Sequence, residues 1–262
     1  MTVRIEKDGR VWTVIHSRPE AKNAMDPASA AALEEAFVAF NADADAAVAV
    51  LWGEGGAFCA GFDLKHAARG SSLDALSFPE DDGTLPRGPM GPTRLELDKP
   101  VIAAVAGPAV AGGFEIALWC DLRVMEQSAY FGVYCRRWGV PLIDGGTVRL
   151  PRIVGRGRAL DLILTGRKVT AEEALRINLC EQVVPDGESR RRAEALAREI
   201  ARFPQGCMRA DRRSVYQQEG LPLREAMRYE WENGIPALAA EGRAGAARFA
   251  SGKGRGGNFG DI

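Results

Sequence analysis

The stretch from Lys99 to Met125 places the strongest constraint on what this chain can fold into. Its sequence is KPVIAAVAGPAVAGGFEIALWCDLRVM, which predicts a strand, a turn of small residues, a helix and a second strand. The run from Val101 to Val105 is short and apolar, as in a strand that is buried on both faces. Residues 109–113 carry no side chain larger than valine, so the backbone there can approach a neighbouring group closely.

Glu115 is the one acidic residue in the apolar helix that follows this turn. A helix that begins near Gly112 directs its free N–H groups and the positive end of its dipole into the turn. Such groups stabilise a carbonyl oxygen that gains negative charge during a reaction, and Glu115 follows within one helical turn. A carboxylate at a helix N-terminus can also simply complement the dipole, which contributes about 0.3–1 kcal/mol. These residues alone favour the catalytic and the structural interpretation equally.

The composition excludes several classes of protein. With 262 residues, 46% of them hydrophobic, the chain can bury a large core, and one domain with a helical appendage is expected. The 34 basic and 35 acidic residues leave a net charge of -1, which favours neither nucleic acid nor a membrane surface as partner. The five cysteines show no C-x-x-C pair, which argues against a disulfide framework or a zinc site. Since signal-peptide and membrane-spanning patterns are also missing, we expect a cytoplasmic protein.

The order of predicted elements indicates a mixed α/β core followed by helices. Strands are expected at residues 3–6, 11–15 and 47–52, the first two joined by an Asp8-Gly9 turn. Asp26-Pro27 predicts a helix start. Residues 67–92, rich in Gly, Pro, Ser and Asp, indicate a mobile segment over a site or a plain surface excursion. From residue 189 onward the pattern is helical.

Five blocks of this sequence resemble the crotonase superfamily, the enoyl-CoA hydratase/isomerase fold. They are RPEAKNAM near the start, residues 53–65, 99–121 and 131–151, and the tail EGRAGAARFASGKGRGGNF. The blocks follow the family's order and cover nearly the whole chain. The resemblance implies an α/β fold, with a crotonase-like ββα spiral core and acyl-CoA site in residues 1–200 and an α-helical C-terminal trimerisation or lid region in residues 201–262. It also implies a homotrimer or a dimer of trimers.

The resemblance further implies a site for the thioester of an acyl-CoA. The backbone N–H groups of Phe62 and Gly112 would hold the thioester carbonyl as an oxyanion hole. The backbone from Phe62 to Lys65 would border the CoA adenine, and Lys22 and Lys65 would meet the CoA phosphates. The whole expected substrate- and CoA-binding set is Lys22, Ala60, Phe62, Asp63, Leu64, Lys65, Gly112 and Gly113. No metal and no cofactor is expected, because CoA is part of the substrate.

The catalytic acids follow from the same resemblance. Glu115 falls on the family's first catalytic glutamate, whereas Cys135 stands where hydratases of the family carry the second. Asp144 lies near the position of an active-site aspartate in other members and is predicted to be the second acid, with an Asx-turn or a helix cap as the alternative. Cys135 is interpreted as a buried small hydrophobe rather than a nucleophile, since no activating histidine is evident.

These residues leave three classes of function open. Adding water to a 2-enoyl-CoA needs a base and an acid, which Glu115 and Asp144 supply, so an enoyl-CoA hydratase of fatty acid metabolism, a lyase, is the prediction. An enoyl-CoA isomerase needs one carboxylate, and a non-catalytic acyl-CoA-binding protein needs none. In the C-terminal region, helically spaced apolar residues are expected in a subunit contact or in the intramolecular core; they are Met227, Trp231, Ile235 and Leu238.

Overall fold

The computed structural model describes residues 2–70, 76–78, 86–254, 256 and 260. Within them the strands form a six-stranded sheet of order β1-β2-β3-β4-β6-β9 and a three-stranded sheet of order β5-β7-β8. The strands are β1 (Val3–Asp8), β2 (Val11–His16), β3 (Val48–Gly53), β4 (Val101–Val105), β5 (Pro108–Val110), β6 (Leu122–Glu126), β7 (Tyr130–Gly132), β8 (Lys168–Thr170) and β9 (Gln182–Val184).

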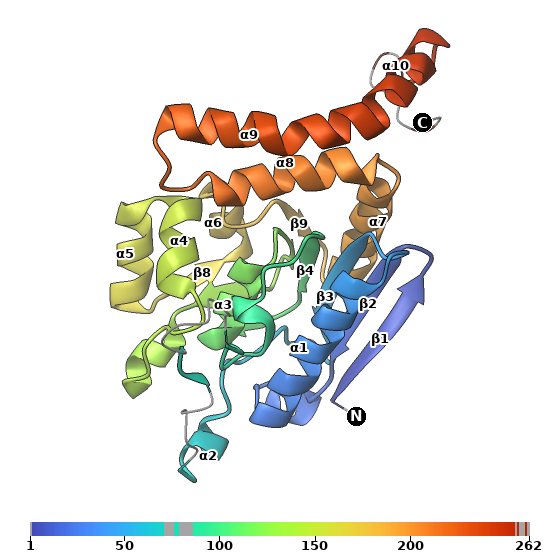
Figure 1. Ribbon diagram of the computed structural model, residues 1–262. Coiled ribbons are helices and arrows are strands. Elements are labelled where there is room, and N and C mark those ends of the chain that lie inside the picture. Colours follow the sequence, from blue (N-terminus) through green and yellow to red (C-terminus); the bar gives the residue numbers. More distant parts are fainter. Residues whose placement is uncertain (1, 71–75, 79–85, 255, 257–259, 261–262) are drawn as a thin grey trace.

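The helices lie between and after these strands (Figure 1). They are α1 (Pro27–Ala42), α2 (Leu64–Ala67), α3 (Gly112–Trp119), α4 (Gly146–Val154), α5 (Arg156–Thr165), α6 (Ala171–Arg176), α7 (Ser189–Ala201), α8 (Gln205–Gln217), α9 (Leu223–Ala237) and α10 (Arg243–Ala250). Short 3-10 turns are η1 (Pro19–Ala21), η3 (Pro92–Arg94) and η4 (Tyr134–Trp138), and the π-turn η5 (Leu238–Gly242) joins α9 to α10.

The large sheet begins with the predicted hairpin and continues with parallel strands. β1 pairs antiparallel with β2, whereas the pairs β2–β3, β3–β4, β4–β6 and β6–β9 are all parallel. Asp8 pairs with Val11, so Gly9 and Arg10 form the turn, one residue later than the expected centre. Gly9 adopts φ 56°, a left-handed conformation that glycine enters without steric cost. The fold class predicted from the sequence is confirmed in these elements.

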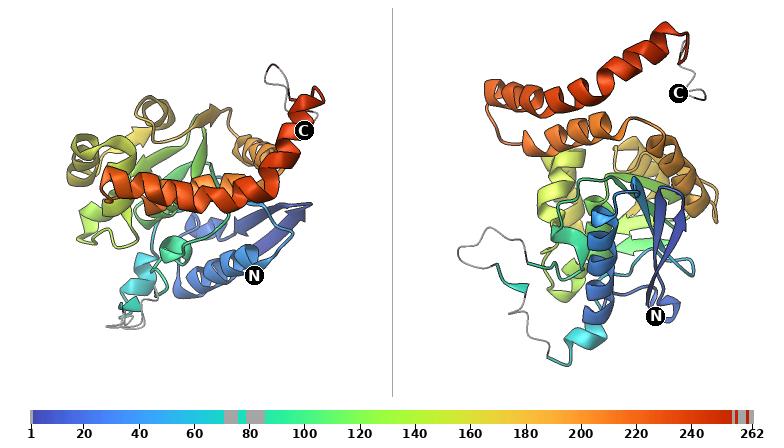
Figure 2. Two further views of the ribbon diagram at one scale, coloured as in Figure 1. Left: turned by 45° about the horizontal axis from the view of Figure 1, so that its top comes forward. Right: turned by 45° about the vertical axis from the view of Figure 1, so that its right-hand side comes forward.

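The two faces of the large sheet are covered by different helices. Alternate residues of β4 point to opposite faces: Val101, Ala103 and Val105 join the larger core, and Ile102 and Ala104 join the smaller one. α1 and α3 pack on the first face, and α7 packs on the second. Figures 1 and 2 show α1 and α7 on either side of the strands. Both faces of the central strands are therefore buried, as their continuous apolar sequence predicts.

The small-residue turn contains a strand that the sequence analysis did not expect. β5 (Pro108–Val110) occupies the first half of this turn and pairs in parallel with β7. On its other side it runs along Cys59, whose amide donates to the Pro108 carbonyl at 3.1 Å and whose carbonyl accepts from Val110 at 3.0 Å. The glycine-rich loop after β3 is thereby held beside the N-terminus of α3.

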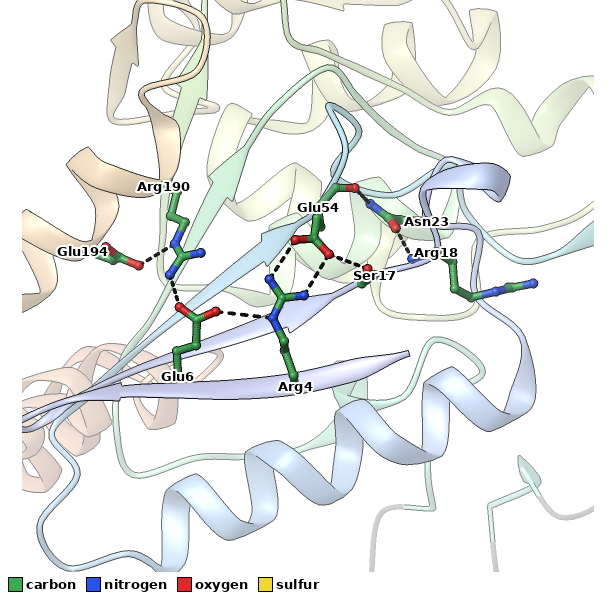
Figure 3. Close-up of polar contacts among 8 residues, drawn as sticks. All are labelled: Arg4, Glu6, Ser17, Arg18, Asn23, Glu54, Arg190 and Glu194. Atoms are coloured by element: carbon green, nitrogen blue, oxygen red, sulfur yellow. Dashed lines mark hydrogen bonds and ion pairs between the residues drawn. The ribbon is translucent and has the colours of Figure 1, made fainter. Parts of the chain in front are cut away.

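An ion-pair network connects the N-terminal hairpin to the end of β3 (Figure 3). Two guanidinium nitrogens of Arg4 each donate to Glu54 at 2.8 Å, and the hydroxyl of Ser17 donates to the same carboxylate at 2.5 Å. These hydrogen bonds, first from Arg4 and then from Ser17, lower the pKa of Glu54 to about 2. On the far side of Arg4, Glu6 also accepts from Arg190 of α7, so the network joins β1 and α7 to the ends of β2 and β3.

Asn23 connects the network to the segment that carries Lys22 (Figure 3). The fully buried Asn23 amide donates to the carbonyls of Glu54 at 2.8 Å and of Ala57 at 2.6 Å, while its oxygen accepts from the Arg18 amide at 2.7 Å. Asn23 adopts φ 56°, which asparagine tolerates better than most residues. The turn from Arg18 to Asn23 is thus fixed against the loop after β3.

The C-terminal helices lie across one end of the molecule. α8 packs between the body and α9, and α10 projects beyond them (Figures 1 and 2). α9 has no buried residue, and most of its apolar side chains are strongly exposed: Met227 63%, Trp231 68% and, just beyond, Leu238 63%. Ile235 is 36% exposed. The interpretation that these side chains belong to the intramolecular core is therefore wrong, and a subunit contact remains a prediction.

Candidate active site

Glu115 lies in the first turn of α3 and is almost completely buried, with 3% of its surface exposed. Its Oε1 accepts hydrogen bonds from the backbone amides of Asp144 at 2.9 Å and Gly146 at 2.8 Å. Burial, followed by the charge of Asp144, raises the pKa of Glu115 to about 7, although the two amides favour its ionised form. A carboxyl that titrates near neutrality is suited to exchange protons with a bound molecule.

The residue before α3 has a strained backbone. Ala111 adopts φ 52° and ψ -126°, a combination that side chains other than glycine rarely enter and that costs on the order of 1–3 kcal/mol. Its amide donates to the Gly132 carbonyl at 2.9 Å. The next amide, that of Gly112, donates to no group in the part of the chain that the structure describes. The strain therefore accompanies a free N–H at the end of a helix dipole.

A second free amide belongs to the loop after β3. Phe62 is flanked by hydrogen bonds from Met25 to the Gly61 carbonyl and from Asp63 to the Met25 carbonyl, both 2.8 Å, yet its own amide donates to none of the described residues. Gly61, at φ 95°, allows the loop to approach α3, since a methyl group there would lie 3.3 Å from the nitrogen of Gly112. The structure thus brings the segments of Phe62 and Gly112 close together.

These two segments and Glu115 border one cavity of about 370 Å³. Its walls are mainly apolar, with Phe62, Met90 and Trp138 among them, and its acidic groups are Glu115 and Asp144. Among the described residues that line it, none is lysine, arginine or histidine. Such a pocket, apolar with a few polar groups and a carboxyl of raised pKa, is the usual form of a small-molecule site.

Asp144 reaches this cavity from the segment before α4 and is 3% exposed. Its Oδ1 accepts from the Met90 amide at 3.0 Å and from the Thr93 hydroxyl. Burial raises the pKa of Asp144, while the bonds from Thr93 and Met90 act in the opposite direction. α4 is capped by Gly145 without a side-chain hydrogen bond, so the alternative that Asp144 caps this helix is wrong.

Sequence reasoning missed the residues that hold Asp144 in place. Arg149 donates to the carbonyls of Asp144 at 3.0 Å and Thr93 at 2.7 Å, and the Thr93 hydroxyl bonds to the carboxylate. Met90 and Thr93 lie in GPMGPT, within or next to the segment interpreted as mobile or as a surface excursion. Residues 71–75 and 79–85 of that segment lie outside the described residues, whereas Met90 is buried. Gly88 and Gly91 were the sequence signal that the backbone of this segment approaches a neighbouring group closely.

Cys135 lies in η4 beside the same cavity and is 6% exposed. Burial raises the pKa of its thiol, which disfavours the thiolate that a nucleophile requires. His16 is buried in β2 and is not among the residues lining this cavity. This environment favours the interpretation of Cys135 as a small buried hydrophobe.

The residues expected to bind CoA lie on two adjacent segments. The Lys22 carbonyl accepts from the Ala60 amide at 3.0 Å, which places the turn of Lys22 next to the loop after β3. Lys65 is exposed in the short helix α2, and Leu64 is 41% exposed. Lys22 and Lys65 are therefore exposed next to Ala60 and Leu64, which line the cavity.

Asp63 and Gly113, also predicted to bind substrate, make structural contacts. The Asp63 carboxylate caps α2 by accepting from Lys65 at 3.1 Å and His66 at 3.3 Å, and it also accepts from Arg18 at 3.2 Å. A methyl group on Gly113 would lie 2.2 Å from the carbonyl oxygen of Cys59, so glycine is required for close packing there. The carboxylate of Asp63 is thus engaged by the protein.

Comparison with protein families identifies the class to which this fold and cavity belong. Residues 6–249 match the family model described as enoyl-CoA hydratase/isomerase. The chain therefore belongs to this family, the crotonase superfamily, and is a crotonase-family enzyme that processes acyl-CoA. In the described residues, no helix is both long and apolar enough to cross a bilayer, and no group of three or more His, Cys, Asp or Glu is placed to hold a metal ion.

Particular relatives agree with this assignment. The chain is 36% identical to the enoyl-CoA hydratase EchA19 of Mycobacterium tuberculosis, over 94% of this chain and 92% of that protein. It is 35% identical to a carnitinyl-CoA dehydratase of Salmonella typhi, over 87% of this chain and 85% of that protein. A crystal structure of enoyl-CoA hydratase EchA1 from Mycobacterium marinum superposes with a TM-score of 0.87 at 33% identity, covering 95% of this chain and 96% of that one.

Proposed function

We propose that this protein is an enoyl-CoA hydratase that adds water across the double bond of a 2-enoyl-CoA. The observation that carries the proposal is the buried Glu115, of raised pKa, in a cavity that the free amides of Phe62 and Gly112 also border. The dehydratase and hydratase names of the relatives support the same reaction class, since dehydration is the reverse of hydration.

In this proposal the two amides form an oxyanion hole for the thioester oxygen. As water attacks Cβ, negative charge moves onto that oxygen, and preorganised donors stabilise it more than they stabilise the neutral thioester. The positive end of the α3 dipole, at Gly112, adds to this effect. The hydrogen bond from Ala111 to the Gly132 carbonyl helps to hold the strained Ala111 backbone, so the Gly112 amide keeps its direction without reorganisation during the reaction.

The two carboxyl groups divide the proton transfers. Glu115, whose pKa is about 7, is the acid that delivers a proton to Cα, and Asp144, with Oδ1 held by two donors, is the base that takes one from water. Within the described residues, Oε2 of Glu115 and Oδ2 of Asp144 form no hydrogen bond. Each carboxyl group therefore has one oxygen available to exchange a proton with substrate or water. One water is consumed, and the pair together neither gains nor loses a proton.

A double-bond isomerase is the second candidate, and Cys135 favours it. The thiol stands at the position of the second glutamate of hydratases, and its raised pKa keeps it from acting as that acid or base at neutral pH. Glu115 alone could remove and return the proton in a 3-enoyl to 2-enoyl shift. The position of Asp144 in the cavity is the reason to prefer hydration.

Two spectrophotometric assays separate these functions. Loss of the conjugated thioester absorbance of crotonyl-CoA reports hydration, and gain of that absorbance from a 3-enoyl-CoA reports isomerisation. A non-catalytic family member would bind acyl-CoA without turnover in either assay, and Glu115→Gln would leave its affinity for acyl-CoA unchanged. Absence of turnover in the first assay, together with turnover in the second, would assign the isomerase.

CoA would lie across the segments of Lys22, Ala60 and Phe62 to Lys65. Lys22 and Lys65 serve as point charges for its phosphates, while the backbone near Leu64 borders the adenine. The reaction moves protons and water only, so the proposal includes no cofactor beyond the CoA of the substrate. Binding of CoA at increasing ionic strength tests this placement, because phosphate contacts weaken as salt rises.

We also propose that the exposed face of α9 and η5 is a subunit contact in a homotrimer or a dimer of trimers. Large apolar side chains are exposed along α9 and the adjoining η5, as is typical of an interface; they are Leu223, Met227, Trp231 and Leu238. Light scattering after size-exclusion chromatography gives the number of subunits directly.

A further inference from the structure

A tight turn projects one side chain towards the proposed thioester site. Gly88 and Gly91 exchange both of their backbone hydrogen bonds, at 3.1 and 2.8 Å, so Pro89 and Met90 form the tip of the turn. Gly91 adopts φ 86°, which this turn requires and which glycine supplies. Pro89 and Met90 both line the cavity. The turn is therefore a defined wall of the site.

The turn is held rigidly from several sides. Oδ1 of Asp144 accepts both the Met90 amide at 3.0 Å and the Thr93 hydroxyl, and Arg149 donates to the Thr93 carbonyl at 2.7 Å. A methyl group on Gly91 would lie 2.5 Å from the carbonyl oxygen of Ala30 in α1, so the backbone there packs against that helix. These contacts fix the backbone from which the Met90 side chain extends.

Met90 lies directly against the first residue of α3. It is 1% exposed, and a methyl group on Gly112 would meet its Sδ at 2.5 Å, its Cγ at 2.8 Å and its Cε at 3.0 Å. The methionine thus fills the space that a side chain at Gly112 would occupy, next to the free amide. In a close-packed site, a further methyl group beside it is poorly tolerated.

Other residues that line the cavity are much more exposed than Met90. Trp138 of η4 is 68% exposed and Ile143 is 43% exposed, and both line the cavity. An apolar chain that leaves the site along these two residues therefore approaches solvent instead of a closed wall. Trp138 and Ile143 therefore restrict a bound group less than the buried Met90 does.

We propose that Met90 is a specificity-determining residue that excludes acyl groups branched at the carbon next to the thioester carbonyl. The proposal rests on the proposed function, in which the Gly112 amide binds the thioester oxygen and the first acyl carbons consequently lie beside Met90. The tail of a linear chain extends past Trp138 and Ile143, so Met90 does not limit its length. The preferred substrates are uncharged linear acyl groups, consistent with the mainly apolar lining.

Binding of saturated acyl-CoAs tests this without any chemistry. Affinities for butyryl-, 2-methylbutyryl- and decanoyl-CoA are measured by calorimetry with the wild type, Met90→Ala and Trp138→Ala. Met90→Ala is expected to raise the affinity for 2-methylbutyryl-CoA relative to butyryl-CoA by about tenfold or more, the effect of one methyl group in an apolar pocket. Its ratio of decanoyl to butyryl affinity stays as in the wild type. Trp138→Ala is the matched control. It is expected to change the ratio of decanoyl-CoA to butyryl-CoA affinity but not the ratio of 2-methylbutyryl-CoA to butyryl-CoA affinity.

Two further variants control for packing. Met90→Leu conserves volume and retains the wild-type preference, while Met90→Val removes less volume than alanine and relaxes the preference if Met90→Ala fails to fold. The role of Met90 would be overturned if Met90→Ala and Met90→Val both bind acyl-CoA but keep the wild-type ratio of 2-methylbutyryl-CoA to butyryl-CoA affinity. The proposed function would then still stand. No binding of any acyl-CoA by the wild type would overturn the inference together with the proposed function.

Discussion

The backbone amide of Asp144 donates to Oε1 of Glu115 at 2.9 Å, while the carboxyl group of Asp144 lines the same cavity. Asp144 therefore helps to fix the position of Glu115 through its main chain, and its charge adds to the effect of burial in raising the pKa of Glu115. The ionisation of Asp144 therefore influences how readily Glu115 gives up its proton. The predictions for the reaction follow from this relationship.

Glu115→Gln is expected to lower the hydration rate by roughly 10²–10⁴-fold, the usual contribution of a positioned acid or base. Glutamine retains an oxygen that can accept from Asp144 and Gly146, so the fold should persist. In the wild type, the protonated form of Glu115 declines above pH 7, and the rate should fall with it. The measurement is kcat/KM for crotonyl-CoA against pH, with circular dichroism as the control for folding. A wild-type profile that is flat from pH 6 to 9 would contradict the assignment of Glu115 as the acid.

Asp144→Asn separates the charge of Asp144 from its hydrogen bonds. Asparagine still offers an oxygen to Met90 and Thr93, so the turn should stay in place. The hydration rate should fall by roughly 10²-fold or more because the base is lost. Any residual activity should show its inflection below pH 7, since removal of a neighbouring negative charge lowers the pKa of Glu115. Full activity in this variant would mean that Asp144 is an anchor only.

The sequence predicted those parts of the site that depend on local pattern. The strand, small-residue turn and helix around Glu115 were predictable because burial on both faces and a helix start leave clear signals. The capping role of Asp26, whose carboxylate accepts from Ser29 at 2.8 Å, is of the same kind. β5 was missed because a three-residue strand of Pro, Ala and Val carries too little pattern.

Contacts between distant segments were not predictable in the same way. Met90 reaches Asp144 across 54 positions and Thr93 reaches it across 51, so neither contact has a local sequence signal. The composition of the segment around them, rich in Gly and Pro, suggested a mobile loop or a surface excursion, whereas its last residues are buried by tertiary contacts. The exposure of Trp231 was likewise not decided by helical spacing, because spacing identifies an apolar face and not what covers it.

Gly112→Ala and Gly113→Ala should damage different properties of the enzyme. The new methyl group at Gly113 would lie 2.2 Å from the carbonyl oxygen of Cys59, and this backbone cannot move aside easily. At Gly112 the obstacle is the Met90 side chain, 2.5 Å away at Sδ, which can change its rotamer at a lower cost than a backbone shift although its own backbone is fixed. Gly113→Ala is therefore expected to lose about 1–3 kcal/mol of stability by overpacking. Gly112→Ala should remain closer to wild type in thermal stability and lose activity instead. Equal thermal midpoints for both variants would argue against this difference in packing.

His16 should make the fold sensitive to mild acid. Burial, followed by the charge of Arg18, lowers the pKa of His16 from 6.5 to about 4, and its Nε2 has no hydrogen-bond partner among the described residues. The unfolded chain then binds more protons between pH 6.5 and 4, so stability falls as pH decreases through this window. The loss approaches about 3 kcal/mol below pH 4, at 1.36 kcal/mol per pKa unit. His16→Leu, followed by urea unfolding at several pH values, should show a smaller decrease in stability over the same range.

Leu238→Asp is expected to break the proposed oligomer, because Leu238 belongs to the apolar surface of α9 and η5 and a carboxylate buried in such an interface is costly. Leu164→Asp is the matched control, since Leu164 is 69% exposed on α5 and Leu238 is 63% exposed, so both substitutions replace an exposed leucine. Light scattering should show smaller assemblies for Leu238→Asp only, with the far-ultraviolet circular dichroism of both variants unchanged. If the C-terminal helices also complete the active site between subunits, the dissociated variant should lose activity in proportion to its monomer fraction. A wild type that is monomeric at micromolar concentration would remove α9 from consideration as a subunit contact.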